Sequence, residues 1–557
     1  MQKTCPQCSA GFEITKQDEG FFQKLTASSP ELNSIPTPTL CPDCRQQRRL
    51  SRRNERTYYQ RKCDLCSNYL ISMYPNDALF PVYCSNCWWS DKWNSGNYAK
   101  GFDFSRSFLE QFQELQNSVP RISLFGKNNQ NSEYIGHSEN SKNCYLCVDV
   151  VAEDTYYSKW IINCQDCCDC YQLEDSNLCY ESQYSSGMQN NIYAFLADQS
   201  NNLLFCYDCE SCTDCLLCFH LRHKRFCINN EQLTEEEYKK RIAELDLGSH
   251  KTYKELLQKY HQIWKDTFHR QNLYINATNC SGDYQYNCEN VRSSFGVIES
   301  KDCAYCYDAG HMQDCQDAYE PAFNCELQYD CHGCNRGKRI LGCSVSYDIV
   351  GCAYCDMCHN STHLFGCIGL KHKDYCILNK QYSKEEYFEL VKKIIEKMKQ
   401  DNEHGKFFPV SLSPFCYNET VAQEYYPLSK EETVSKGFNW KDAKDEVPNV
   451  TKIIPANQLP DNIKDIPDDI LNWAIRCEAT DRPFLIVKQE LLFYRKMNLP
   501  VPRLHPDERH KRRMAFTNPR KLLKRDCDKC GKDMETTFDT DKSLTVYCEE
   551  CYLKEVY

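Results

Sequence analysis

The chain has 557 residues, 41 of them cysteine, and a formal net charge of −11. That length allows several domains with sizeable cores, and the acidic balance excludes nucleic-acid binding by bulk charge alone. No apolar run is long enough to cross a bilayer and the polar first residues do not read as a signal peptide, so we expect a cytoplasmic protein without a membrane partner. In a reducing compartment, Cys-x-x-Cys pairs indicate zinc rather than disulfides.

Residues 1–95 contain four Cys-x-x-Cys pairs and are predicted to form a double zinc-ribbon module. Two such turns supply the four thiolates that a tetrahedral Zn²⁺ ion requires. We predict one site at Cys5, Cys8, Cys41 and Cys44, and a second at Cys63, Cys66, Cys84 and Cys87. Because cysteine fills all four positions of each site, neither site keeps an open position for catalysis.

Residues 96–130 are predicted to be a connector with a helix around 108–115, because Phe108, Phe112 and Leu115 recur at helical spacing. Residues 131–400 form an array in two copies, 131–266 and 267–400. A phrase from Cys218 to Cys227 recurs 149 residues later, from Cys367 to Cys376. The Cys-x-x-Cys pairs inside each copy recur about every 24 residues, without helical periodicity. We therefore expect a mainly β chain with a duplicated parallel β-helix or solenoid, each copy closed by a helix near 233–266 or 383–400.

The array cysteines allow three interpretations. Residues i and i+3 of a flat strand point to opposite faces, so both point inward only where the chain bends between them. We favour cysteines stacked as small buried hydrophobes, because Asn191 and Ala194 replace one pair without ending the repeat. Additional zinc ligation and redox chemistry are the alternatives.

Residues 401–470 are predicted to be mostly linker, since seven prolines are spread through a mostly polar sequence. Residues 471–557 repeat the N-terminal module. The third predicted zinc site is Cys527, Cys530, Cys548 and Cys551. The counterpart of the first site has degenerated to Cys477, Thr480, His505 and Glu508, and we favour a module held there by apolar packing over a retained metal.

Basic residues cluster in the same place in both modules. Residues 45–62 and 503–525 each carry a net charge of +7, while the rest of the chain carries −25. We predict that these segments contact an RNA or DNA backbone. The proposed contacts are Arg45, Arg48, Arg49, Arg52, Arg53, Arg509, Arg512 and Arg513. The alternative is that these arginines pair with the excess acids of the chain itself.

Several phrases resemble an uncharacterised family of large cysteine-rich zinc-ribbon proteins of candidate-phylum bacteria and large DNA viruses. They are Cys41-Pro-Asp-Cys44-Arg45, Val82-Tyr83-Cys84, Trp88-Trp89-Ser90-Asp91-Lys92-Trp93 and Asn143-Cys144-Tyr145-Leu146-Cys147. The resemblance covers most of the chain. It implies zinc-ribbon-like ends and no known activity, and no functional residues carry over from it.

The sequence thus predicts a non-enzymatic binding scaffold stabilised by three structural Zn²⁺ ions, whose partner is RNA or DNA or else a protein. No phosphate-binding loop or marked acid/base couple is present. One alternative is a structural, capsid-like protein that docks partners through the array. A second is a carbohydrate-active β-helix hydrolase, which spacing alone does not exclude.

Overall fold

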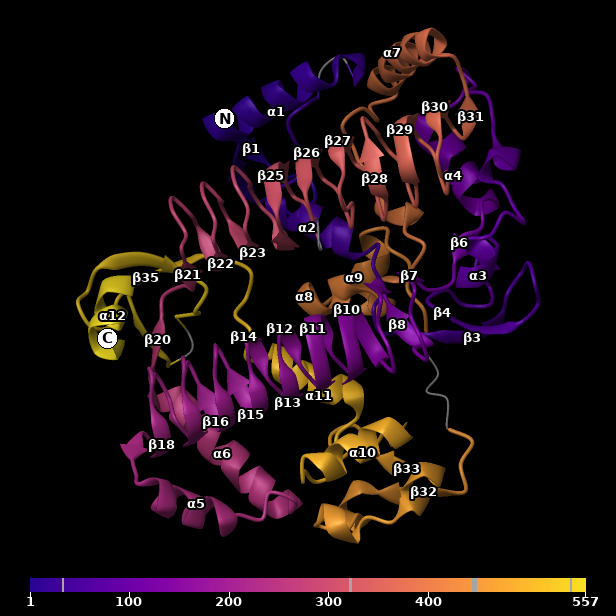
Figure 1. Cartoon of the computed structure of the whole chain (residues 1–557). Helices are drawn as coiled ribbons and strands as arrows, with labels where there is room; N and C mark the ends of the chain where they lie inside the picture. Colours follow the sequence, from indigo (N-terminus) through magenta and orange to yellow (C-terminus); the bar gives the residue numbers. More distant parts are fainter. Residues whose placement is uncertain (33–34, 320–322, 443–447, 541–542) are drawn as a thin grey trace. The chain divides into compact units, whose positions relative to one another are not determined.

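The computed structural model describes residues 1–32, 35–319, 323–442, 448–540 and 543–557 (Figure 1). Its strand content of 32% exceeds its helix content of 26%, so the predicted mainly β character is confirmed. The chain forms two compact units, and neither is continuous in sequence. Unit 1 comprises Met1–Leu124, Asn272–Asp442 and Arg520–Leu522, whereas unit 2 comprises Phe125–Gln271, Ala443–Pro519 and Leu523–Tyr557. The N-terminal module thus shares a unit with the second array copy, and most of the C-terminal module shares one with the first.

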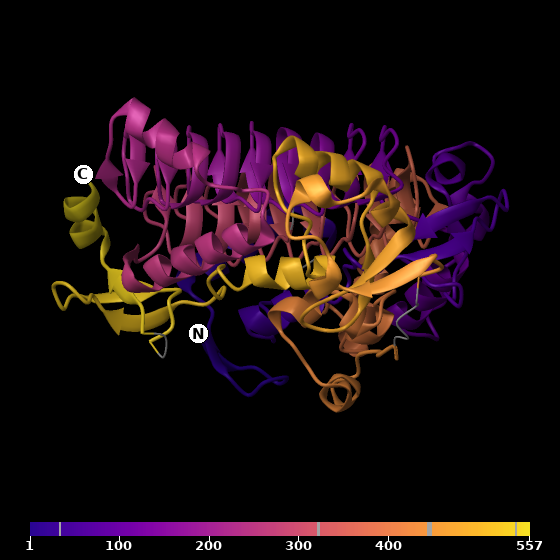
Figure 2. The ribbon, with the colours of Figure 1, turned by 90° about the horizontal axis from the view of Figure 1, so that it is seen from below.

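The first array, in unit 2, consists of parallel strands paired in steps along the chain (Figure 2). Asn201 pairs with Thr213 and Cys215 with Cys227, so the usual step is 12 residues, although Val148 pairs with Lys159 over a step of 11. The parallel strands are β8 (Tyr134–Gly136), β10 (Tyr145–Tyr156), β11 (Lys159–Cys168), β12 (Tyr171–Glu174), β13 (Asn177–Tyr180), β14 (Gln183–Ser186), β15 (Gln189–Phe195), β16 (Asn201–Tyr207), β17 (Thr213–Leu216) and β18 (Arg225–Ile228). The pairing of β11, β12, β14, β15 and β13 returns to its start, a closed path of five parallel strands.

The second array, in unit 1, has the same parallel pairing. Its strands are β21 (Tyr274–Ile275), β22 (Gly282–Tyr286), β23 (Ser294–Ile298), β24 (Tyr307–Gly310), β25 (Met312–Gln316), β26 (Cys325–Tyr329), β27 (Lys338–Leu341), β28 (Tyr347–Val350), β29 (His359–Phe365) and β30 (Asp374–Ile377). Ser294 lies opposite Gly282 and Cys376 opposite Leu364, again 12 residues apart. The predicted period of about 24 residues is therefore two steps of 12.

A left-handed residue at every third position sets this step. The φ angles of Phe205, Asp208, Ser211 and Asp214 are 54°, 53°, 52° and 55°. Each of these residues directly precedes a buried cysteine, in order Cys206, Cys209, Cys212 and Cys215. The bend keeps residues i and i+3 on the inside, as the stacking interpretation requires. It also explains the abundance of Asn and Asp, which tolerate this conformation best after glycine.

Helices follow both arrays where the sequence predicts them. In unit 2 they are α5 (Glu235–Ala243) and α6 (His250–Asp266), and in unit 1 α7 (Lys384–Gln400). Capping boxes at Thr234 and Ser383 form the N-termini of α5 and α7, so the local sequence determines where these helices begin. The predicted connector helix is α4 (Phe108–Ser118), whose apolar face is fully buried in the core of unit 1.

Residues 401–470 are more structured than the predicted linker. Phe407, Phe408 and Leu412 are buried in the core of unit 1. In unit 2, β32 (Lys452–Pro455) pairs in parallel with β33 (Trp473–Arg476) of the C-terminal module. Many of the prolines lie in or beside short 3-10 turns, which is why proline density alone suggested a linker.

Candidate metal centres and their supporting contacts

The structure brings the cysteines of all three predicted zinc sites together. Within each set, the four Sγ atoms lie within 4.8 Å of one another. The sets are Cys5, Cys8, Cys41 and Cys44; Cys63, Cys66, Cys84 and Cys87; and Cys527, Cys530, Cys548 and Cys551. No other group of His, Cys, Asp or Glu side chains converges in this way within the described part of the chain.

The sulfur spacing fits a tetrahedral metal. A Zn–S bond of about 2.3 Å places two sulfurs of a tetrahedron about 3.8 Å apart. The Sγ–Sγ distances are 3.6 Å for Cys8 and Cys41, 3.9 Å for Cys66 and Cys84, and 3.7 Å for Cys530 and Cys548. Four thiolates at this spacing suit Zn²⁺ and fill its coordination sphere, so the residues fit a structural rather than a catalytic ion.

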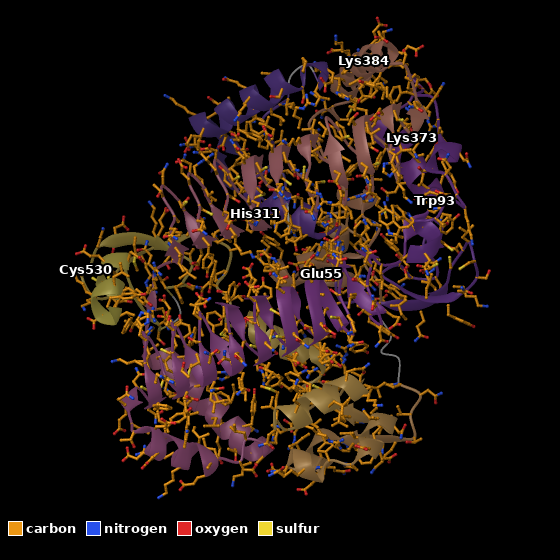
Figure 3. The ribbon with its side chains drawn as sticks, viewed as in Figure 1. Glu55, Trp93, His311, Lys373, Lys384 and Cys530 are labelled. Atoms are coloured by element: carbon orange, nitrogen blue, oxygen red, sulfur yellow. The ribbon has the colours of Figure 1, made fainter. Side chains whose placement is uncertain are left out.

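Backbone N–H groups prepare these thiols for metal binding. The Cys84 N–H donates to Cys63 Sγ at 3.3 Å, and the Cys548 N–H donates to Cys527 Sγ at 3.2 Å. Burial alone would raise the pKa of Cys63, but N–H groups of Cys66, Cys84 and Leu65 outweigh it and lower the pKa to about 7. The thiolate is the metal-binding form, so the turn itself favours the ligand state. Cys530 is the exposed member of its set (Figure 3).

The degenerate fourth site has the same backbone turn as the intact sites but not their four cysteines. The His505 N–H donates to Cys477 Sγ at 3.2 Å, as in the intact sites. His505 Nδ1 instead accepts from the Asp507 N–H at 3.1 Å, and Glu508 pairs with Lys511 at 2.7 Å. Phe484 and Ile486 are buried beside Cys477 in the core of unit 2. Apolar side chains thus pack around Cys477, and His505 and Glu508 have protein partners.

The array cysteines form buried stacks. Cys206 Sγ lies 3.4 Å from the Leu204 carbonyl and 3.5 Å from the Cys215 carbonyl of the next step. Cys209 and Cys358 repeat this arrangement. Burial raises the pKa of Cys206 well above its ordinary value, so the thiol stays protonated and acts as a small hydrophobe with a weak donor.

The basic segment of the N-terminal module meets acids of the second array. Arg45 and Arg49 lie on α2 (Pro42–Leu50) and are 2% and 3% exposed. Arg45 Nε lies 2.5 Å from Asp317, and Arg49 Nη1 lies 2.9 Å from Asp330. Arg48 also pairs with Asp330. Burial would raise the pKa of Asp330, but Arg48 and Arg49 outweigh it and hold the pKa below its ordinary value.

The C-terminal module repeats these contacts with the first array, inside unit 2. Arg509 Nη1, on α11 (Pro506–Met514), lies 3.0 Å from Asp169. Arg513 Nη1 lies 2.5 Å from the same carboxylate, and Arg512 pairs with Glu181. Arg509 also reaches Glu490 at 3.1 Å. We call these two sets of ion pairs the arginine clamps.

The clamps correspond residue by residue. Arg509, Arg512 and Arg513 align with Arg45, Arg48 and Arg49. Their acids also occupy the same place, because Asp317 follows β25 and Asp169 follows β11, with φ of 62° and 57°. Sequence reasoning missed these acids, although their equivalent positions in the two array copies were a usable signal.

The eight arginines proposed as nucleic-acid contacts lie in the arginine clamps or close to them in sequence. Arg52 is 7% exposed, donates to the Leu412 carbonyl at 2.9 Å and lies 3.7 Å from Asp356. Arg53 is 2% exposed and pairs with Glu55 at 2.7 Å. All eight arginines are thus engaged with acids of their own unit, as the alternative interpretation holds. Most of these side chains are buried, while Arg48 and Arg512 keep 12% and 25% of their side-chain surface exposed.

Comparisons with protein-family models and with curated proteins find no match to this chain. None of the helices in the described ranges combines the length and apolar character needed to span a membrane.

Proposed function

We propose that this chain is a non-enzymatic scaffold in which three Zn²⁺ ions hold two ribbon modules, and each module pairs through its arginines with one parallel β-helical array. The observation that carries the proposal is the set of three tetracysteine groups at zinc spacing. The 12-residue parallel steps and inward cysteine stacks support the β-helix assignment of the arrays.

A protein partner fits this scaffold better than nucleic acid gripped through the basic segments. The arginines proposed for phosphate contact are mostly buried and engaged with acids, so binding phosphate there would require breaking the clamps. The array faces are then the surfaces left to dock a partner, in the way that other solenoids use theirs.

The same ion pairs support a scaffold over a hydrolase. Asp169, Asp317 and Asp330 are buried acids of the arrays, and each pairs with arginine. A glycosidase needs two carboxyl groups facing a substrate, one of them with a raised pKa. The pKa values of Asp169 and Asp330 are lowered instead, because their arginines outweigh the effect of burial.

Native mass spectrometry of the full chain tests the proposal directly. We expect three zinc ions per chain, released together with loss of protease resistance when a strong chelator is added. A chain without metal, or with iron in place of zinc, contradicts the proposal. A count above three assigns zinc to array cysteines. A pull-down with and without nuclease then distinguishes a protein partner, which survives nuclease, from a nucleic acid.

A further inference from the structure

Unit 1 contains a pocket of about 420 Å³ between the N-terminal module and the second array. The module side comes from the segment after α3 (Ser85–Trp88), with Trp89, Asp91 and Trp93. The array side comes from β29 and the turn before β30, with Lys371 and Lys373 (Figure 3, where Trp93 and Lys373 are labelled). A volume of this size falls within the range of small-molecule sites.

Tryptophan rings surround a lysine at this pocket. Lys371 Nζ lies 3.8 Å from the ring centre of Trp88, 4.9 Å from that of Trp89 and 5.1 Å from that of Trp93. It also donates to the Trp88 carbonyl. Trp88 is fully buried and fixes the ammonium, whereas Trp89 is 37% exposed and offers a ring at the pocket wall. The pocket therefore combines a held cation with aromatic surface.

The pocket carries excess positive charge. Lys371 and Lys373 line it, against a single carboxylate, Asp91. Neither lysine forms a salt bridge with any residue that the structure describes. Burial lowers the pKa of Lys371 to about 8, and the charge of Asp91 only partly opposes this. An ammonium in this state gains most from a bound anion.

The equivalent position of the first array shows how protein groups alone can neutralise a cation at this place. The counterpart of Lys371 in unit 2 is Arg222, which lies 2.8 Å from Asp208 and 3.3 Å from Glu210. It also lies 5.1 Å from the ring centre of Tyr557 in the C-terminal module. Arg222 is therefore neutralised inside its own unit.

Unit 1 has an aromatic ring at the matching place, Trp93, but lacks both of these acids. With the 149-residue offset, the counterparts of Asp208 and Glu210 are Met357 and His359. The counterpart of His220, which pairs with Asp208 at 2.6 Å, is Gly369, which lines the pocket. A Cβ at Gly369 would lie 3.2 Å from Val119 and 3.5 Å from Trp93, so a side chain there would enter the space. At this place the second array thus has neither of the two acids of the first array, and it has glycine where the first array has His220.

We propose that this pocket binds a nucleoside phosphate, with the phosphate at Lys371 and Lys373 and the base against Trp89 and Trp93. Lysine ammoniums recognise phosphate as point charges, and every nucleobase stacks on an indole ring. The ligand is either a free nucleotide or the terminal nucleotide of a single strand, because both present the same chemistry. This site is independent of the arginine clamps and of the scaffold proposal.

Calorimetric titration of the full zinc-loaded chain at low salt tests this site. The probes are AMP, adenosine, inorganic phosphate and a 5′-phosphorylated single-stranded oligonucleotide. We expect AMP to bind at least about tenfold more tightly than adenosine or phosphate alone, since it uses both halves of the pocket. Tighter binding of the oligonucleotide than of AMP identifies a strand end as the source, and weaker binding identifies a free nucleotide.

Two variants locate the site. Lys373→Gln and Lys371→Met should each weaken AMP binding by at least about tenfold. Lys380→Met is the matched control, because Lys380 also lies over an aromatic ring, Tyr382 at 5.3 Å, outside the pocket. The proposal is overturned if AMP does not bind, if adenosine or phosphate binds as well, or if Lys373→Gln binds AMP like the wild type. Zinc content of each variant confirms folding, and failure here leaves the scaffold proposal standing.

Discussion

Arg45 and Asp317 are 272 residues apart in the sequence, yet Arg45 Nε lies 2.5 Å from the Asp317 carboxylate in the interior of unit 1. Arg509 and Asp169 form the matching contact in unit 2. In both units, arginines of the basic segment thus fasten the module to buried acids of the array. The C-terminal module, whose first cysteine set is incomplete, has the same arginines, and the acids that they contact are buried.

The intact and degenerate sites should respond differently to loss of a thiol. Cys66→Ser removes one of four ligands, and a structural zinc site supplies on the order of 10 kcal/mol of folding free energy. We expect loss of one zinc ion and rapid proteolysis near residues 63–87. Cys477→Ser should keep all three ions. Equal zinc loss in the two variants would show that the degenerate site still holds metal.

Breaking a clamp should cost far more than breaking a surface pair. Asp317→Asn leaves Arg45 buried without its charge partner, which should lower the free energy of unfolding by about 3–5 kcal/mol. Asp169→Asn should do the same in unit 2. The control is Asp348→Asn, because Asp348 pairs with Arg336 at the surface, where side chains are 37% and 50% exposed. That change should cost about 1 kcal/mol or less in urea unfolding. Similar losses in all three variants would argue against the clamps.

Because Arg48 and Arg49 form part of a clamp, replacing them should disturb folding rather than polyanion binding. Arg48→Gln with Arg49→Gln should expose the N-terminal module to protease rather than alter the salt dependence of binding. Filter binding of DNA at low and physiological salt measures that dependence. If the double variant stays protease-resistant and its salt slope flattens, these arginines contact phosphate after all.

A buried histidine should make unit 1 sensitive to mild acid. His332 is 3% exposed, and its Nδ1 lies 3.0 Å from Ser344 Oγ. Burial, followed by the charges of Arg53, Arg52 and Arg49, lowers the pKa of His332 well below its ordinary value. The unfolded chain takes up this proton near pH 6.5 and the folded chain does not, so stability should fall as pH drops below about 6.5.

His332→Gln should reduce that fall. Thermal unfolding midpoints at about pH 7.5 and about pH 5.5 measure it. His372→Gln, at an exposed position, is the control and should keep the full dependence. An unchanged dependence in His332→Gln would mean that other groups, such as His261 and His269 in unit 2, carry it.

Local patterns in the sequence predicted local structure well. The zinc ligand sets follow from Cys-x-x-Cys spacing, and the connector helix from the helical spacing of Phe108, Phe112 and Leu115, because both depend on neighbouring residues. The 12-residue step was not predicted, because at some positions cysteine occurs only in every second step. Within each step the bends are marked by Asn and Asp instead. The partners of Arg45 and Arg509 could not be read from spacing, since buried ion pairs join residues hundreds of positions apart.

The discontinuous composition of the units has a consequence for synthesis. Arg45 leaves the ribosome 272 residues before Asp317, a delay of roughly 14 to 54 seconds at usual elongation rates. During that interval Asp169 of the first array is already available, and it presents an equivalent acid to the waiting helix. The first partner to emerge is thus the wrong one. We therefore expect folding in the cell to depend on elongation rate and on chaperones that shield the arginines of the N-terminal module.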